Sequence, residues 1–254
     1  MTRSEANALR PPPPRRRVRG TCALVLACEH ASRSVPLRYR KLFRRREALL
    51  ESHRGWDPGA LELARHLARQ FDAPLFRGVV TRLLVDLNRS LQSPTLFSEH
   101  ALRLEEKERL ALLARYWEPY RHAVRHCLEE SLERHRRVLQ FSVHSFTPRL
   151  RGEVRPTDVG LLFDPARAAE ERFCRDFRAA LQRELPELRI DLNEPYSGVS
   201  DGLTTTLRGE FKTRYLGVEL EVNQRFPRGD RARWRALQRA IGRALAEALR
   251  APRK

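Results

Sequence analysis

Short apolar runs alternate with longer amphipathic segments along most of this chain, and this order restricts the folds that it can adopt. Residues 23–28 form one such run, and in residues 58–71 the apolar side chains recur at helical spacing on one face. Strands that alternate with helices pair in parallel, because each helix carries the chain back to the edge where the previous strand began. The sequence therefore predicts an α/β fold with a largely parallel sheet between helical layers.

The rest of the chain continues this alternation. We expect further strands at residues 74–76, 83–87, 139–143, 159–163, 189–192 and 215–222. We expect further helices at residues 105–137, with a break near Pro119, at 166–183 and at 231–249. Residues 1–20 lack apolar periodicity and carry a run of prolines and then arginines, which predicts a disordered basic tail. Residues 21–251 are expected to form a single domain.

The composition is strongly basic, with a formal net charge of +18 at pH 7. Such a charge is typical of proteins that bind nucleic acid or other polyanions. The arginines, however, are scattered among glutamates along the expected helices, as on solvated helix faces. We therefore do not expect nucleic acid as a partner, although a basic anion- or nucleic-acid-binding protein without catalysis is kept as an alternative.

The cysteines and the lengths of the apolar segments bear on the cellular location of this chain. The four cysteines show no CxxC pairing, and no secretory signal precedes them, so we expect a reducing, cytoplasmic location. No apolar stretch approaches the roughly 18 residues that a transmembrane helix needs. A membrane partner is therefore not expected.

Two histidines, His30 and His144, each close an apolar run that is expected to be a strand. Ligands of open α/β sheets lie beyond the carboxyl ends of the strands, although a single histidine there is more often structural. Asp57 stands just before Pro58 and the helix expected after it, so it can cap that helix or bind a ligand. Two imidazoles and one carboxylate form the three-ligand set of catalytic zinc sites, with a fourth position for water. The sequence predicts one divalent metal at these residues, with Zn²⁺ favoured and Mn²⁺ or iron also compatible.

Three further polar segments accompany these residues. Glu219 and Glu221 share one face of an otherwise buried strand, so they can serve as a general base or pair with arginine. Asn88 and Arg89 end the Asp-x-Asn-Arg segment, which suits a bound carboxylate or an Arg–Asp pair that braces the loop. Residues 193–208 are rich in turn formers and predict a long loop, either functional or a plain surface connection.

Several motifs together resemble those of one known family. They are CEHAS (residues 28–32), WDPGA (56–60), DLNR (86–89), VHSFTP (143–148), NEPY (193–196), DGLT (201–204) and LEVNQ (220–224). In this order they look like the N-formylglutamate amidohydrolase family, and the resemblance covers residues 23–226. It implies a three-layer α/β/α sandwich with a mostly parallel, mixed sheet, similar to zinc carboxypeptidases and zinc amidases. It also implies that residues 21–251 form a hydrolase domain for a small-molecule N-formyl or N-acyl amino acid.

The resemblance also assigns roles to individual residues. It implies a metal held by His30, Asp57 and His144, with Glu221 as the catalytic base. It implies that Asn88 and Arg89 bind a substrate carboxylate, with Arg82 and Arg208 as second carboxylate partners. Thr205 stands where many relatives have histidine, so the rate or the substrate can differ. A peptidase or amidase of other carboxylated amides on the same scaffold is a further alternative.

Overall fold

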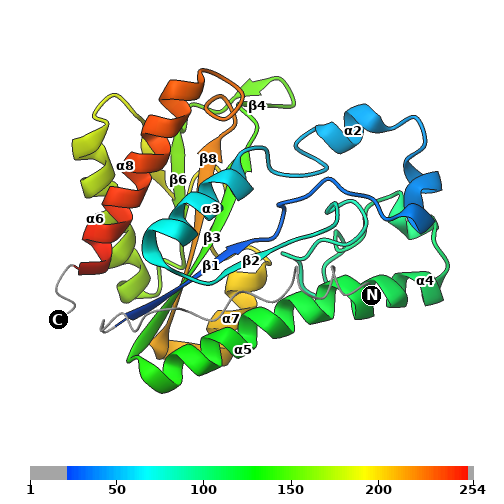
Figure 1. Ribbon diagram of the computed structural model, residues 1–254, viewed down its shortest axis with the longest axis horizontal. Coiled ribbons are helices and arrows are strands. Elements are labelled where there is room, and N and C mark those ends of the chain that lie inside the picture. The colour runs from blue at the N-terminus through cyan, green and yellow to red at the C-terminus, as the bar shows by residue number, and fades with distance from the viewer. Residues whose placement is uncertain (1–21, 251–254) are drawn as a thin grey trace.

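The computed structural model describes residues 22–250, and a six-stranded sheet forms its centre (Figure 1). Its strands, in spatial order, are β2 (Leu75–Arg77), β1 (Cys22–Cys28), β3 (Arg137–Phe146), β8 (Tyr215–Asn223), β6 (Val159–Leu162) and β7 (Ile190–Leu192). A separate hairpin pairs β4 (Arg149–Leu150) with β5 (Glu153–Val154). The basic tail predicted for residues 1–20 lies outside the described residues.

Strand direction confirms the prediction of a mostly parallel, mixed sheet. Strands β2, β1, β3 and β8 run parallel, β6 runs antiparallel to β8, and β7 runs parallel to β6. The pairing register sets His144 of β3 beside Glu221 of β8. On the other side of β8, Gly160 of β6 pairs with the same Glu221. The centre of the sheet therefore brings a predicted metal ligand and the predicted base together.

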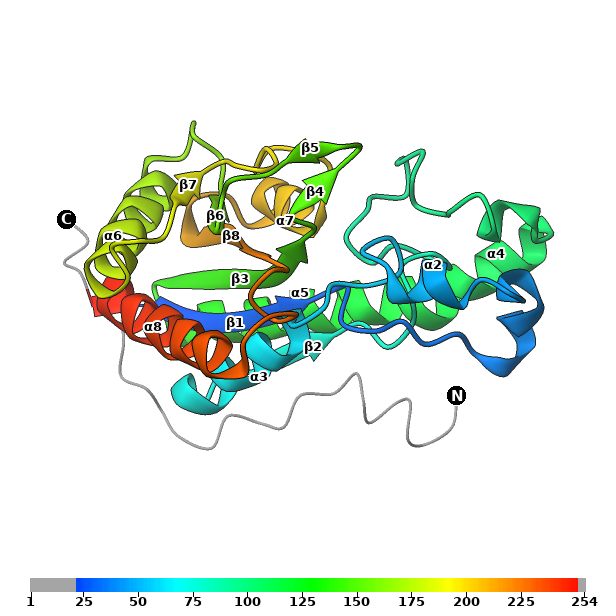
Figure 2. The ribbon, with the colours of Figure 1, turned by 90° about the horizontal axis from the view of Figure 1, so that it is seen from above.

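Helices cover both faces of the sheet, so the molecule has three layers (Figure 2). One face packs against α3 (Ala60–Phe71), α6 (Ala168–Glu184) and α8 (Arg231–Arg250), and the other against α5 (Glu118–Arg134) and α7 (Leu203–Phe211). Shorter helices are α2 (Glu47–Glu51), α4 (Glu106–Leu112), η1 (Leu37–Phe43), η2 (Ala101–Arg103), η3 (Leu113–Trp117) and η4 (Lys212–Arg214). Among the described residues, no helix combines the length and apolarity that a membrane span requires.

The two faces of the central strands differ in chemistry. Leu139, Phe141 and Val143 alternate along β3 and pack into the core that α6 covers. The ring centre of Phe141 lies 6.0 Å from that of Phe177 in α6. Burial of each such side chain stabilises the fold by about 1.5–3 kcal/mol. Because side chains alternate along a strand, the residues between these three point to the opposite face of the sheet.

The opposite face is polar toward the carboxyl ends of the strands. Gln140, Ser142 and His144 occupy it on β3, and all three are buried. Glu219 and Glu221 occupy it on β8, beside the β3 residues to which the register pairs them. Buried polar side chains need partners, which an apolar helix face does not supply. At this end of the sheet, contacts on this face are therefore made by polar side chains.

The strand predicted for residues 83–87 is wrong, because the structure has turns there. The amide of Leu84 donates to the carbonyl of Thr81 at 3.0 Å, which closes the first turn. The amide of Asn88 donates to the carboxylate of Asp86 at 2.9 Å, which closes the second. The apolar side chains of this segment are buried in the core below α5 and α7. Burial therefore explains their hydrophobicity without strand pairing.

Two further expectations need correction. The long loop predicted for residues 193–208 ends early, because α7 begins at Leu203. The amide of Leu203 donates to Oδ1 of Asn88 at 2.8 Å, so a side chain from a distant segment supports the first turn of this helix. The break predicted near Pro119 is a π-helical turn, η3, just before it. Pro119 itself lies in the first turn of α5, where the missing N–H costs no hydrogen bond.

Candidate metal centre and active site

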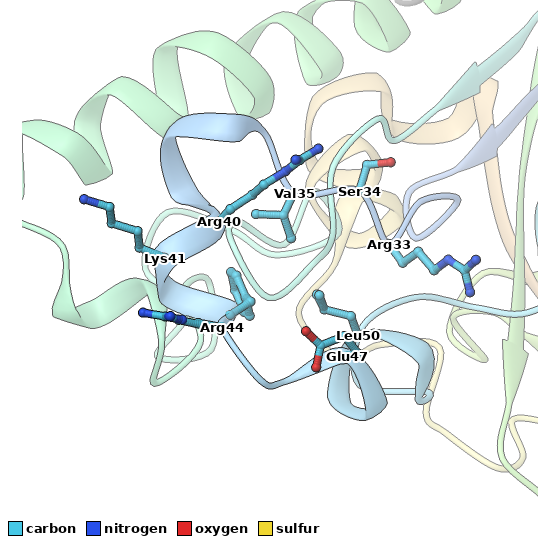
Figure 3. A pocket seen from close by; sticks show the side chains of 9 residues that line it. Arg33, Ser34, Val35, Arg40, Lys41, Arg44, Glu47 and Leu50 are labelled. Atoms are coloured by element: carbon cyan, nitrogen blue, oxygen red, sulfur yellow. The ribbon is translucent and has the colours of Figure 1, made fainter.

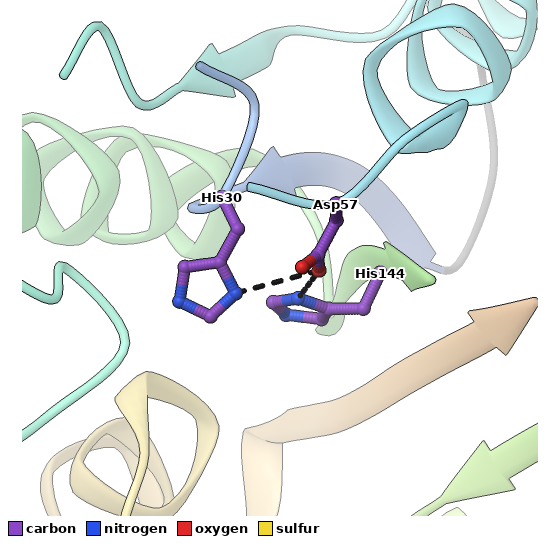
Figure 4. A group of neighbouring side chains, drawn as sticks. All are labelled: His30, Asp57 and His144. Carbon is purple, nitrogen blue, oxygen red and sulfur yellow. Dashed lines mark hydrogen bonds and ion pairs between the residues drawn. The ribbon is translucent and has the colours of Figure 1, made fainter. Parts of the chain in front are cut away.

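His30, Asp57 and His144 converge at one point beyond the carboxyl ends of β1 and β3 (Figure 4). One nitrogen or oxygen atom of each lies within 4.8 Å of the others, and all three residues are buried. His30 follows β1, His144 belongs to β3, and Asp57 precedes α3. The structure therefore confirms the prediction that these three residues come together.

A single oxygen of Asp57 lies close to both imidazoles. Its Oδ2 is 3.4 Å from Nδ1 of His30 and 2.9 Å from Nδ1 of His144. The backbone holds Asp57 here, because its amide donates to the carbonyl of His30 at 3.0 Å. The amide of Ser145 adds a contact of 3.3 Å to Asp57 Oδ2. The Nδ1 atoms and this carboxylate thus face a common point.

The far nitrogen of each imidazole lies against a second carboxylate. Nε2 of His30 donates to Oδ1 of Asp86 at 2.7 Å, and Nε2 of His144 lies 3.1 Å from Oε2 of Glu29. A carboxylate in this position fixes the ring and leaves the near nitrogen available for a metal. Neither role can be read from the sequence, because nothing in the local pattern shows which imidazole nitrogen a distant carboxylate will meet.

Three carboxylates, those of Asp57, Asp86 and Glu29, surround the two imidazoles of this cluster. Although burial acts in the other direction, contacts with Asp57 and Glu29 hold the pKa of His144 well above its ordinary value. The pKa of Asp57 is lowered against the effect of burial, chiefly by His30 and His144. The buried Nδ1 of His30 has no hydrogen-bond partner among the described residues. Two imidazole nitrogens and a carboxylate oxygen that converge on one buried point are a donor set that fits a divalent metal.

Glu221 lies beside this cluster as a buried carboxyl group. It is 6% exposed, and its Oε2 has no hydrogen-bond partner among the described residues. Burial, offset in part by His144, and the charges of Asp57 and Glu219 raise the pKa of Glu221 to about 8. Glu219 differs, because its Oε1 accepts a hydrogen bond from Thr204 at 2.5 Å. Of the two glutamates predicted on this face, Glu221 is thus the more deeply buried, and its buried Oε2 is unsatisfied.

The DLNR segment contributes the carboxylate of a brace and, in Arg89, a half-buried guanidinium. Arg82 donates to Oδ2 of Asp86 from Nη2 at 2.7 Å and from Nε at 3.0 Å, so the Arg–Asp brace involves Arg82 rather than Arg89. Nη1 of Arg82 also lies 3.8 Å from Oδ1 of Asp57. Arg89 is half-buried and donates from Nη1 to the carbonyl of Asp201 at 2.7 Å. Arg82 thus lies between Asp86 of this segment and Asp57, a candidate metal ligand.

Two side chains of the helical layer hold the backbone of Arg89. Nε1 of Trp117 donates to the Arg89 carbonyl at 2.9 Å, and Nη1 of Arg121 donates to it at 3.3 Å. The guanidinium of Arg121 lies 4.7 Å from the ring centre of Trp117. These contacts join residues about thirty positions apart, so no sequence spacing signals them. Both residues position Arg89.

Arg208 has a different environment from the one predicted for a substrate ligand. It is buried, and its Nε lies 3.1 Å from a carboxylate oxygen of the equally buried Glu170. Nη2 donates to the carbonyl of Gly217 at 2.8 Å, and Nη1 contacts the carbonyl of Gly198. Thr205, noted for its departure from relatives, donates to the carbonyl of Ser200 at 2.7 Å. The structure thus ties the Arg208 guanidinium to β8 and α6 and does not bring it to the metal ligands.

The segment that carries the NEPY motif crosses beside Glu221. A side-chain carbon on Gly160, which pairs with Glu221, would lie 1.9 Å from the carbonyl oxygen of Glu194. Tyr196 follows, and its hydroxyl lies 2.9 Å from Nη1 of Arg155. Burial and the nearby charge of Glu221 raise the pKa of Tyr196. Gly160 therefore permits this segment to approach the candidate base.

A cavity of about 650 Å³ lies apart from the metal ligands, between η1, α2 and the segment after His30. Its lining includes the cations Arg33, Arg40, Lys41 and Arg44 (Figure 3). Arg33 and Lys41 point in opposite directions, and Arg33 pairs with Glu51. These cations do not converge, so the cavity does not present a focused anion site.

Comparison with known proteins identifies the family of this chain. A family model described as N-formylglutamate amidohydrolase matches residues 22–226. The chain belongs to this family. Membership supports an amidohydrolase activity on a small-molecule substrate. A search of curated proteins gave no match.

Solved structures share the fold. A gene product of Agrobacterium tumefaciens matches at 29% identity with a TM-score of 0.74, over 90% of this chain and 91% of that chain. An N-formylglutamate amidohydrolase from Ralstonia eutropha matches at 16% identity with a TM-score of 0.67, over 90% and 93%. A metallo-carboxypeptidase from Burkholderia cenocepacia matches more weakly, at 14% identity with a TM-score of 0.40, over 90% and 57%. The two stronger matches cover nearly the whole of both chains, so the α/β architecture is shared in full.

Proposed function

We propose that this protein is a metal-dependent amidohydrolase that cleaves the amide of an N-formyl or N-acyl acidic amino acid, such as N-formylglutamate. The observation that carries the proposal is the buried group of His30, Asp57 and His144 beside Glu221. The family of the chain supports the reaction type. A carboxylated substrate is supported by Asn88 and Arg89, which follow closely after Asp86, the carboxylate that contacts His30.

Nδ1 of His30, Nδ1 of His144 and the carboxylate of Asp57 would hold the metal. Nitrogen and carboxylate donors in this number favour Zn²⁺. When bound, such an ion supplies a lowered pKa for water and polarises the scissile carbonyl. The neighbouring Arg82 brace keeps Asp86 on His30, and so keeps the His30 ring in the orientation that binding needs.

Glu221 moves the proton. Its free Oε2 takes a proton from the attacking water and returns it to the nitrogen of the leaving amine. A pKa of about 8 leaves the carboxyl group protonated at neutral pH while no cation is near. A divalent charge at Asp57 lowers that pKa by Coulomb attraction. Glu221 thus becomes a base at neutral pH when the site is loaded.

Substrate orientation falls to the DLNR segment. Arg89 and Asn88 bind a carboxylate of the amino acid, with Arg82 as the second cation, because a guanidinium and an amide together offer several donors. Trp117 and Arg121 hold the Arg89 backbone during binding. We assign Arg208 to the fold rather than to the substrate, since Glu170 and two carbonyls occupy it.

The test combines metal content and turnover. Protein purified without chelator is analysed for bound metal, and release of formate from N-formylglutamate is measured beside a panel of N-formyl and N-acetyl amino acids. We expect one equivalent of metal, lost in the His30→Ala, His144→Ala double variant, and preference for acidic amino acids. A preference for amides without a side-chain carboxylate would favour a related amidase or peptidase. Metal content unchanged in the double variant, or tight salt-dependent binding of nucleic acid without turnover, would contradict the proposal.

A further inference from the structure

We propose that Glu29 is a positioning residue of the metal centre, whose carboxylate accepts the Nε2 proton of His144 and leaves Nδ1 of that ring to the metal. The inference rests on the proposed function. It adds a residue that lies immediately before a predicted ligand in the sequence but acts on the other histidine, which belongs to a different strand.

The first support is the contact between two buried atoms. Oε2 of Glu29 and Nε2 of His144 lie 3.1 Å apart, and the two residues are 1% and 2% exposed. The structure gives neither atom a regular hydrogen bond within residues 22–250, so this ion-pair contact is the polar contact that it shows for each. Each is thus the group within reach that can satisfy the other, and an unsatisfied buried polar atom costs about 1–3 kcal/mol.

The second support is the way in which the other oxygen of Glu29 is anchored. Its Oε1 accepts hydrogen bonds from the hydroxyls of Ser142 at 3.1 Å and Tyr120 at 3.2 Å. Ser142 in turn accepts from Nε2 of Gln140 at 2.7 Å. This chain of donors points toward Glu29, as an ionised carboxylate requires. With one oxygen held in this way, the other is fixed in front of His144.

The third support is the comparison with the other buried carboxylates. Asp86, which binds Nε2 of His30, is neutralised by Arg82, and Glu170 is neutralised by Arg208. Within residues 22–250, the ion pair that the structure shows for Glu29 is with His144. A buried ion pair between a carboxylate and an imidazole gives a fold little net stability, because both groups lose their hydration. A role in holding the His144 ring therefore explains why a carboxylate occupies the position of Glu29.

The consequence concerns the protons of His144. Its Nδ1 lies 2.9 Å from Asp57 and its Nε2 faces Glu29, so both nitrogens have an acceptor for a proton. With a metal held at Nδ1, the proton at that nitrogen would pass to solvent, and the one at Nε2 would stay on the ring, held by Glu29. Without the charge of Glu29, the ring loses both its orientation and part of its basicity as a ligand.

The experiment measures the affinity of the full chain for Zn²⁺ by competition with a chromophoric chelator. Glu29→Gln keeps the size and shape of the side chain and removes its charge. We expect at least tenfold weaker binding, within the 10–100-fold range that such supporting carboxylates contribute. Glu170→Gln is the matched control, since Glu170 is also a fully buried carboxylate but pairs with Arg208. We expect that control to lower the unfolding midpoint and to keep the Zn²⁺ affinity within about twofold of the wild type, because it touches no metal ligand.

A second measurement does not depend on the folding of any variant. Long-range nitrogen NMR on the zinc-loaded wild-type protein is expected to show His144 protonated at Nε2. A proton at Nδ1, Zn²⁺ affinity of Glu29→Gln within twofold of the wild type, or equal weakening by both variants would each overturn the inference. A wild-type protein that binds no zinc would instead overturn the proposed function and this inference with it.

Discussion

Replacement of Glu221 by glutamine should stabilise the metal-free protein while it abolishes catalysis. Burial raises the pKa of this carboxyl group to about 8, from an ordinary value of 4.5. The folded state therefore holds a proton that the unfolded state releases between pH 4.5 and pH 8. Since the unfolded state binds fewer protons in this interval, the free energy of unfolding falls as the pH rises through it.

The size of the effect follows from the two pKa values. Each unit of difference is worth about 1.4 kcal/mol, so the carboxyl group costs the metal-free fold roughly 3 kcal/mol at pH 7 and roughly 4–5 kcal/mol above pH 8. The cost disappears below pH 4.5, where both states are protonated. Glutamine is neutral at every pH and of nearly the same shape. Glu221→Gln is thus expected to exceed the wild type in stability by these amounts.

The assay is urea unfolding of chelator-treated protein at acidic, neutral and mildly alkaline pH, followed by circular dichroism. In the metal-loaded enzyme we expect metal content to be unchanged and kcat to fall by about 10²–10⁴-fold, the usual contribution of a general base. A variant that is no more stable than the wild type at alkaline pH would refute the reasoning from burial. Wild-type turnover would refute the role of Glu221 in proton transfer.

Three further predictions concern the surroundings of the site. Arg89→Met is expected to raise KM by about 10–100-fold with a smaller change in kcat, because it removes charged hydrogen bonds worth about 1.5–3 kcal/mol; steady-state kinetics check this, and an unchanged KM would contradict it. Gly160→Ala is expected to destabilise the fold by about 1–3 kcal/mol and to slow turnover, because the added carbon would lie 1.9 Å from the Glu194 carbonyl; an unchanged melting temperature speaks against the close approach. Burial and nearby arginines lower the pKa of His66 from 6.5, so the unfolded state binds the proton first and stability falls as the pH drops below that value. His66→Gln should flatten this slope in urea unfolding between mildly acidic and neutral pH, and an identical slope would exclude His66 as a source.

Sequence reasoning succeeded where the signal is local. A run of apolar residues predicts β3 because burial on the α6 face demands them, and helical spacing predicts α3 and α8. The strand predicted for residues 83–87 is wrong because turns buried below α5 carry the same apolar residues as a strand, and hydrophobicity alone does not distinguish the two. Helix α7 shows another, because the group that supports its first turn is Asn88, on a distant segment.

The sequence by itself determined the α/β class and the types of residue at the strand ends: two imidazoles, a carboxylate and a candidate base. Only the tertiary structure decided how their charges are arranged. The contact of Glu29 with His144, and that of Asp86 with His30, join segments far apart in the chain. Periodicity reports which face of an element is buried, but it does not report which distant polar group meets it there. That pairing depends on strand order and register, which arise when the whole core packs.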